Sequence, residues 1–286
     1  MKLSIVTPSF NSSRFISETI ETVLSQKGHF ELEYIIVDGG STDGTVEIIK
    51  EYADKYSNIK WISEPDEGMY DAINKGFSLA TGDIFAWINT DDKYEFGAFD
   101  KIAYVFSKFS EIRWLKGITS YIDENSKVTS VGKCFLYKKE WIEKGFYGKD
   151  MFFIQQDSVF WRKELWGKVA SIDKNLKFAG DYWLWLQFAK YAELYSFNQV
   201  VSYFRKSDGQ LSSERDKYYL EMDKIRVHHK LKKDLWLFKQ LNRRRKKGKL
   251  FNLLLKYLFW YKSHCVFCNE NGVIEIKKMY ELMVSK

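Results

Sequence analysis

The sequence is poor in proline and cysteine. Only two prolines occur among 286 residues, so no proline-rich linker marks a domain boundary. The three cysteines, Cys134, Cys265 and Cys268, are an odd number in a long chain, which favours a reducing compartment over a disulfide framework. Met1 is not followed by the charged, apolar and small-residue segments of a secretory signal. We therefore expect a cytoplasmic protein.

Long apolar runs are also missing. The longest run in the basic C-terminal part, residues 257–261, is far below the ~20 residues that a membrane-spanning helix needs. Hydrophobic residues still make up 45% of the chain and aromatic residues 17%. This composition excludes a disordered or fibrous protein and supplies a core for one large domain, with or without an appendage.

Positive charge is concentrated near the C-terminus. Residues 224–262 hold fourteen Lys or Arg and one Asp, so this segment has a net charge of +13. The whole chain has a net charge of +7, so the other residues together carry −6. We expect residues 213–286 to form a basic, aromatic-rich helical extension. Trp236, Phe251 and Trp260 lie among the basic residues, a composition suited to an anionic membrane surface on the inner face of the cell membrane. A partner protein or a plain solvated helix remains open, and we expect no nucleic acid.

The first hundred residues alternate apolar runs with helical patterns. Three strand-then-helix units precede a fourth strand, and the strands are rich in Val and Ile, as in strands covered on both faces. The pattern predicts an α/β domain with a mostly parallel central sheet flanked by helices. The expected strands are 3–8, 34–38, 59–63 and 83–89, and the expected helices are 15–26, 45–56 and 68–80.

Polar residues gather where these strands end. Thr7–Asn11, Asp38–Asp43 and Asn89–Asp92 each follow the carboxyl end of a predicted strand. Open α/β sheets bind their ligands at that edge. The three loops are therefore expected to line one cleft.

Four blocks in this order resemble family 2 glycosyltransferases of the GT-A fold: "SIVTPSFN", "IIVDGGSTDGT", "GDIFAWINTDD" and "AGDYWLWLQFAK". The resemblance covers about residues 1–212, with a nucleotide-binding half at about 1–95 and an acceptor half at about 96–212. The stretch "SEPDEGMYDAINKGFSLATGDIFAWINTDD" is similar to bacterial enzymes that build cell-surface polysaccharide. The resemblance implies a Rossmann-like sheet and a nucleotide-sugar donor.

On the donor side, the resemblance assigns Asp38 to the imide N–H of a uracil ring, a group that only an acceptor satisfies. Read alone, Asp38 is equally an ordinary turn residue. The resemblance also places a further set of residues at the nucleotide: Thr7, Pro8, Phe10, Asn11, Asp66 and Asp91.

The acidic stretch that follows the fourth strand is expected to hold Mn²⁺ or Mg²⁺. Both cations prefer carboxylate oxygen and neutralise charge on a departing nucleoside diphosphate. We place the metal mainly on Asp92 and give Asp91 a ribose or second metal contact. The family pattern often has Asp where this chain has Asn89. Taken alone, the stretch is a solvated turn.

Asp181 is the expected catalytic base. An inverting transfer needs a base within hydrogen-bond reach of the acceptor hydroxyl, and the resemblance places it in "AGDYWLWLQ". A helix-capping Asp is the structural alternative, and both roles are compatible.

The chain departs from its relatives at Ser207, where many of them have His near the diphosphate or metal. Arg205 or Lys206 is then expected to supply positive charge to the diphosphate. Gln156 and Trp161 are candidate acceptor contacts, although aromatic residues more often belong to a core. The stretch "HCVFC", residues 264–268, has metal-like spacing but no second pair of ligands.

These residues predict an inverting, metal-dependent glycosyltransferase. It would transfer a hexosyl or N-acetylhexosaminyl group to a hydroxyl of a glycan or lipid-linked glycan. The expected donor is a UDP-sugar. Two alternatives remain. A nucleotidyltransferase should carry glycine in the loop after the first strand, which "TPSFNSSRF" lacks. The other alternative is an inactive transferase fold that binds nucleotide sugars or acts as a scaffold. Ser207, in place of the family His, favours this alternative.

Overall fold

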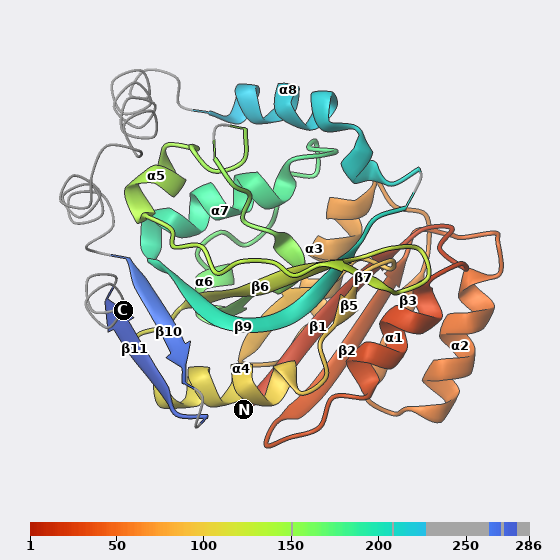
Figure 1. The fold of residues 1–286 in the computed structure, drawn as a ribbon. Helices are drawn as coiled ribbons and strands as arrows, with labels where there is room; N and C mark the ends of the chain where they lie inside the picture. Colours follow the sequence, from red (N-terminus) through yellow and green to blue (C-terminus); the bar gives the residue numbers. More distant parts are fainter. Residues whose placement is uncertain (150, 208, 227–262, 270–271, 279–286) are drawn as a thin grey trace.

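One mixed sheet runs through the molecule (Figure 1), and the computed structural model describes residues 1–149, 151–207, 209–226, 263–269 and 272–278. Its strand order is β11-β10-β9-β6-β8-β4-β1-β2-β3. The strands on this path are β1 (Lys2–Ser9), β2 (Glu31–Asp38), β3 (Ile59–Ser63), β4 (Ile84–Trp87), β6 (Trp114–Ile122), β8 (Val159–Arg162), β9 (Leu194–Arg205), β10 (His264–Cys268) and β11 (Ile274–Lys278). Two short strands flank it: β5 (Lys93–Tyr94) pairs with β9, and β7 (Val128–Ser130) pairs with β6.

Most neighbouring strands run in the same direction. The pairs β1–β2, β2–β3 and β1–β4 are parallel, as are β6–β9 and β10–β9. β8 is antiparallel to both β4 and β6, so β6 has the direction of β4. The mostly parallel α/β sheet predicted from the sequence is confirmed. The antiparallel β8 was not predicted.

Helices cover both faces of the sheet (Figure 1). They are α1 (Ile16–Leu24), α2 (Thr45–Lys55), α3 (Met69–Leu79), α4 (Ala98–Lys108), α5 (Lys139–Glu143), α6 (Lys163–Trp166), α7 (Gly180–Tyr191) and α8 (Arg215–Ile225). Successive side chains of a strand point to opposite faces. In β1, Val6 packs in the apolar cluster with α3 and α7, while Ile5 packs in the cluster with α1 and α4. Both clusters are fully buried around the central strands, which explains the continuous apolar runs.

The C-terminal extension is only partly as predicted. α8 is the helix expected after residue 213, but residues 264–268 and 274–278 are strands, so the prediction of helices there is wrong. β10 joins the sheet edge at β9 in parallel, and β11 pairs with β10 in antiparallel. An uncovered β9 would expose unpaired backbone groups, and the hairpin satisfies them. The stretch "HCVFC" is thus a strand rather than a metal loop.

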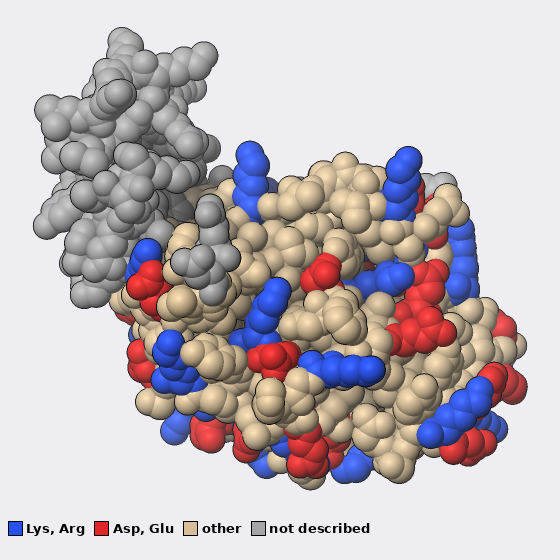
Figure 2. Space-filling model, turned by 60° about the horizontal axis from the view of Figure 1, so that its bottom comes forward, with Lys and Arg blue, Asp and Glu red and all other residues tan. Residues whose placement is uncertain are grey.

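The described surface carries both signs of charge. Figure 2 shows Lys and Arg interspersed with Asp and Glu on the face turned forward. The basic aromatic stretch expected at a membrane, residues 231–261, lies outside the described residues. Among the residues that are described, no helix is both long and apolar enough to cross a bilayer.

Candidate active site

The three predicted loops meet at the carboxyl ends of β1, β2 and β4. Asn11 after β1 donates its backbone N–H to Ser41 Oγ, and its Oδ1 accepts the Thr42 N–H over 3.0 Å. Thr90 after β4 donates to Ser12 Oγ over 2.9 Å. These bonds tie the loops into one rim, and they confirm the prediction that the loops converge.

The rim opens into a large cavity of about 1130 Å³. Its lining combines aromatic, amide, carboxylate and cationic side chains and includes Pro8, Phe10, Asn11, Asp66, Asn89 and Asp91. Phe10 is 64% exposed, so its ring is available to a ligand. The cavity therefore gathers most of the residues expected to bind a nucleotide.

Thr7 and Asp38 do not line this cavity. Thr7 is fully buried, and its hydroxyl is 3.0 Å from the Tyr34 hydroxyl inside the sheet. Asp38 is also fully buried and accepts hydrogen bonds from its own loop, including those of the Gly40 and Ser41 N–H groups. A direct side-chain contact from either residue to a nucleotide conflicts with this geometry.

Asn89 lines two adjoining cavities of the site, whereas Asp91 and Asp92 each line one of them. Asp91 lines the large cavity and accepts a hydrogen bond of 2.6 Å from Gln210. Asp92 is 1% exposed, and its Oδ1 accepts the backbone N–H of Arg205 over 2.9 Å. Burial and the neighbouring carboxylates raise the pKa of Asp92 well above its usual range. Burial also raises the pKa of Asp91. Asp91 lines the large cavity, whereas Asp92 lines the adjoining aromatic cavity.

A second cavity adjoins the first. This aromatic cavity has a volume of about 520 Å³, and its lining includes Trp87, Tyr121, Gln156, Asp181, Lys206 and Tyr219. Asn89, Ser207 and Gln210 line both cavities. Two ligands could thus meet at this shared wall, one from each side.

Asp181 lies in the first turn of α7, under the helix α8. Its Oδ1 accepts the Tyr182 N–H over 2.7 Å and the Tyr218 hydroxyl over 3.0 Å. Burial raises the pKa of Asp181 to about 6. Such a carboxylate is mostly ionised at neutral pH and can take up a proton.

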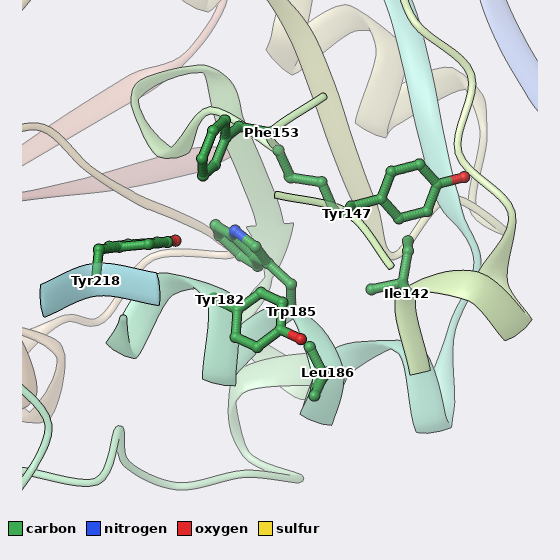
Figure 3. Close-up of a pocket in the computed structure, with 8 residues that line it drawn as sticks. Ile142, Tyr147, Phe153, Tyr182, Trp185, Leu186 and Tyr218 are labelled. Atoms are coloured by element: carbon green, nitrogen blue, oxygen red, sulfur yellow. The ribbon is translucent and has the colours of Figure 1, made fainter. Parts of the chain in front are cut away.

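α8 is held over this carboxylate by its own contacts. Glu221 accepts the N–H groups of residues 177–179 ahead of α7. Figure 3 shows Tyr218 of α8 pointing toward Trp185 of α7. Both residues, together with Tyr182, line a small void of about 10 Å³. α8 therefore packs against α7 here with little space left between the two helices.

Two expected ligand contacts are structural instead. Arg205 is fully buried and donates to Asp91 O, Asp123 O, Glu124 O and the Glu18 carboxylate. Trp161 is fully buried, with ring centroids 5.5 Å from Trp87 and 6.1 Å from Trp185. Neither side chain lines the large or the aromatic cavity, and full burial contradicts the expected diphosphate and acceptor contacts of these two residues. Lys206 and Gln156 do line the aromatic cavity.

Sequence reasoning missed three residues of this site. Tyr218 lies 37 positions beyond its partner Asp181, and Gln210 reaches Asp91 from the far half of the chain. Asp157 is a fully buried carboxylate that lines the aromatic cavity and accepts from Ser202 over 2.5 Å. Asp157 directly follows the predicted acceptor contact Gln156 in "QQDS", and this position could have indicated a role in the site.

The family model for glycosyl transferase family 2 matches residues 4–163, more than half of the chain. The chain therefore belongs to this family. Among similar curated proteins, an uncharacterized glycosyltransferase of Nostoc is 33% identical over 44% of this chain and 39% of its own length. TuaG of Bacillus subtilis, named for teichuronic acid biosynthesis, is 37% identical over 32% of this chain and 37% of its own length. In both cases the match spans well under half of the relative.

Solved structures share the GT-A fold. S. aureus TarS in complex with UDP-GlcNAc has a TM-score of 0.61 at 18% identity, covering 90% of this chain and 76% of that one. The mannosyltransferase PcManGT of Pyrobaculum calidifontis, in complex with GDP-Man and Mn²⁺, has a TM-score of 0.58 at 14% identity. It covers 86% of this chain and 65% of that one. At these identities the likeness establishes the fold.

Proposed function

We propose that the chain is an inverting glycosyltransferase that moves a sugar from a nucleotide sugar, with a UDP-sugar as the expected donor, to a hydroxyl of a glycan or lipid-linked glycan. The observation that carries this proposal is the shared wall at Asn89. On one side Asp91 faces the large cavity, and on the other Asp181 lines the aromatic cavity. A single displacement needs donor and acceptor on opposite sides of the reacting carbon.

The large cavity suits the nucleotide and its diphosphate. Phe10 offers a ring face, and Asn11 and Asp66 offer polar atoms in the same cavity. The UDP-GlcNAc complex of TarS, a structure with the same fold, supports a UDP-sugar as donor.

A divalent cation fits the oxygen atoms at the shared wall. Asn89 Oδ1 is buried and finds no hydrogen-bond partner within the described part of the chain. The described residues contain no cluster of three His, Cys, Asp or Glu side chains that would hold a metal without ligands from the substrate. Mg²⁺ and Mn²⁺ bind through one or two carboxylates together with substrate phosphates. Asp91 and Asn89 would hold such an ion, which neutralises charge on the departing diphosphate when bound.

Asp181 would act as the base. The acceptor hydroxyl gives its proton to the Asp181 carboxylate while its oxygen forms the new glycosidic bond. The bond between the anomeric carbon and the diphosphate breaks, and the electron pair leaves with the nucleoside diphosphate. Lys206 and Gln156 would position the acceptor in the aromatic cavity. Teichuronic acid in the name of TuaG supports a surface polysaccharide as acceptor.

The donor is tested by thermal shift with UDP-, GDP- and dTDP-sugars, each with and without Mn²⁺. We expect the largest stabilisation with a UDP-sugar and Mn²⁺ together. An inactive nucleotide-binding scaffold would bind the same ligand but release no UDP. Metal-dependent UDP release that is lost in Asp91→Asn would favour the enzyme over the scaffold.

We also propose that the basic stretch at residues 231–261, outside the described residues, holds the enzyme at the inner membrane surface. Removing residues from 231 onward should release the protein from membranes and preserve activity on a soluble acceptor. Unchanged recovery with membranes would contradict this proposal.

A further inference from the structure

The carboxylate of Asp38 is buried and accepts four hydrogen bonds from neighbouring residues. Its Oδ2 accepts the Gly40 and Ser41 N–H groups and the Ser63 hydroxyl over 2.8–3.1 Å, and its Oδ1 accepts the Ser41 hydroxyl. A carboxylate offers about four acceptor positions. Oδ2 accepts three of these bonds and Oδ1 accepts one, and the side chain has no exposed surface, so a base in the large cavity cannot reach Asp38.

The Asp66 carboxylate lies against Gly39, the residue that follows Asp38 in the sequence. A Cβ atom on Gly39 would lie 2.7 Å from Asp66 Oδ2, closer than ordinary packing permits. The missing side chain is therefore the space that the Asp66 carboxylate occupies. Asp66 comes from the β3–α3 loop, and both residues line the large cavity.

One oxygen of Asp66 is free for a ligand. Oδ1 accepts the Gly68 N–H over 2.8 Å, which fixes the orientation of the carboxylate. Oδ2 receives no hydrogen bond from the residues that the structure describes. The exposed ring of Phe10 lies in the same cavity and provides a stacking face. A flat base is recognised by a stacking surface together with a hydrogen-bond acceptor at its edge.

We propose that Asp66, in the space left by Gly39, accepts the ring N–H of the donor base and selects uracil over cytosine. The inference rests on the proposed function, because it names the residue that reads the nucleotide. Uracil presents an N–H at ring position 3, and cytosine presents a lone pair there. An ionised carboxylate accepts from the first and repels the second.

The test is calorimetric binding of UDP and CDP to the full chain with Mn²⁺. The wild type should bind UDP at least 10-fold more tightly than CDP, since a carboxylate facing a lone pair leaves both groups unpaired. In Asp66→Asn, the Gly68 N–H should hold the amide oxygen at the Oδ1 position and place the amide N–H₂ at the position of Oδ2. UDP should then weaken by about 10-fold and CDP should strengthen. Glu67→Gln is the matched control, because Glu67 also lines the large cavity but pairs with Lys174. Its preference for UDP should equal that of the wild type.

Gly39→Ala gives a second, independent variant. Its methyl group would displace the Asp66 carboxylate, so UDP binding should fall while the fold, checked by circular dichroism, persists. Both substitutions act through one carboxylate. The double variant should therefore bind UDP no more weakly than Asp66→Asn alone.

An Asp66→Asn variant with the wild-type ratio of UDP to CDP affinity would overturn the inference and leave the proposed function intact. Loss of the ratio in folded Asp38→Asn, with Asp66→Asn unchanged, would return base recognition to Asp38. A wild-type chain that binds neither nucleotide would contradict both the inference and the proposed function.

Discussion

The Tyr218 hydroxyl donates a hydrogen bond of 3.0 Å to Asp181 Oδ1. Tyr218 lies on α8, the first helix beyond the GT-A part expected to end near residue 212, and Asp181 lies in the first turn of α7. The extension thus contributes to the environment of the proposed base. It stabilises the ionised form of a carboxylate whose burial favours the neutral form.

Tyr218→Phe should move the acidic limb of the rate profile upward. Burial already raises the pKa of Asp181 to about 6, and the Tyr218 hydrogen bond lowers it. A hydrogen bond to a charged group contributes ~1.5–3 kcal/mol, so its loss should raise the pKa by about 1 to 2 pH units. The measurement is kcat/KM between pH 5 and 9.

Tyr219→Phe is the control for this profile. Tyr219 lines the same aromatic cavity but makes no hydrogen bond to Asp181 in the described structure. Its pH profile should match that of the wild type. A Tyr218→Phe variant that is slower at every pH, with an unshifted limb, would show that Tyr218 acts only through packing.

Asp181→Asn should be inactive and more stable at neutral pH. The folded pKa of about 6 exceeds the ordinary value of 3.8, so the folded protein binds the proton more tightly than the unfolded chain. Stability is therefore lost as pH rises from about 4 to about 6, by roughly 3 kcal/mol. The asparagine removes this loss.

Urea unfolding at pH 7.5 and pH 4 measures the effect. Asp181→Asn should be more stable than the wild type at pH 7.5, and the difference should shrink at pH 4. The exposed Asp54→Asn on α2 serves as control and should show no such difference. Equal stability of Asp181→Asn and wild type at both pH values would contradict the burial argument.

Substitutions at Arg205 and Lys206 should have different effects, one on stability and the other on activity. Arg205→Met would leave three backbone carbonyl groups without their buried donor, at a cost of about 1–3 kcal/mol of unfolding free energy for each buried acceptor left unpaired, while Glu18 keeps Lys93 as a partner. Lys206→Met, at an exposed position beside the Tyr121 ring, should change that free energy by less than about 0.5 kcal/mol and lower transfer activity. Denaturant unfolding and transfer rates together distinguish the two. Comparable destabilisation by Arg205→Met and Lys206→Met would contradict this prediction.

Asp91→Asn should weaken activation by Mn²⁺ more than Asp92→Asn does. Asp91 lines the large cavity proposed for the diphosphate, whereas Asp92 lines the aromatic cavity. We expect the Mn²⁺ concentration for half-maximal UDP release to rise by 10-fold or more in Asp91→Asn. A larger shift in Asp92→Asn would restore the assignment made from the sequence.

Local patterns predicted the first part of the fold well. The strands β1 to β4 and helices α1 to α3 follow apolar periodicity, which depends only on neighbouring residues. The pairing of β8, and of β10 with β9, depends on contacts far apart in the chain. Short apolar runs such as "HCVFC" carry no information about which strand they meet.

The site was predicted by residue type more reliably than by environment. Asp91 and Asp181 do line the two cavities. Arg205 and Trp161 have side chains suited to a diphosphate and a sugar, and the same properties suit a buried ion pair and an aromatic core. Only the packing of β9 and β8 decides between these roles.

The stereochemistry of UDP-sugar hydrolysis tests the central claim most directly. With Mn²⁺ and an α-linked UDP-sugar, water activated by Asp181 attacks the face opposite the diphosphate. Time-resolved proton NMR should therefore show the β anomer of the free sugar first, and Asp181→Asn should lose this release by about 10²-fold or more. First appearance of the α anomer, or unchanged release in Asp181→Asn, would contradict an inverting transfer at this carboxylate.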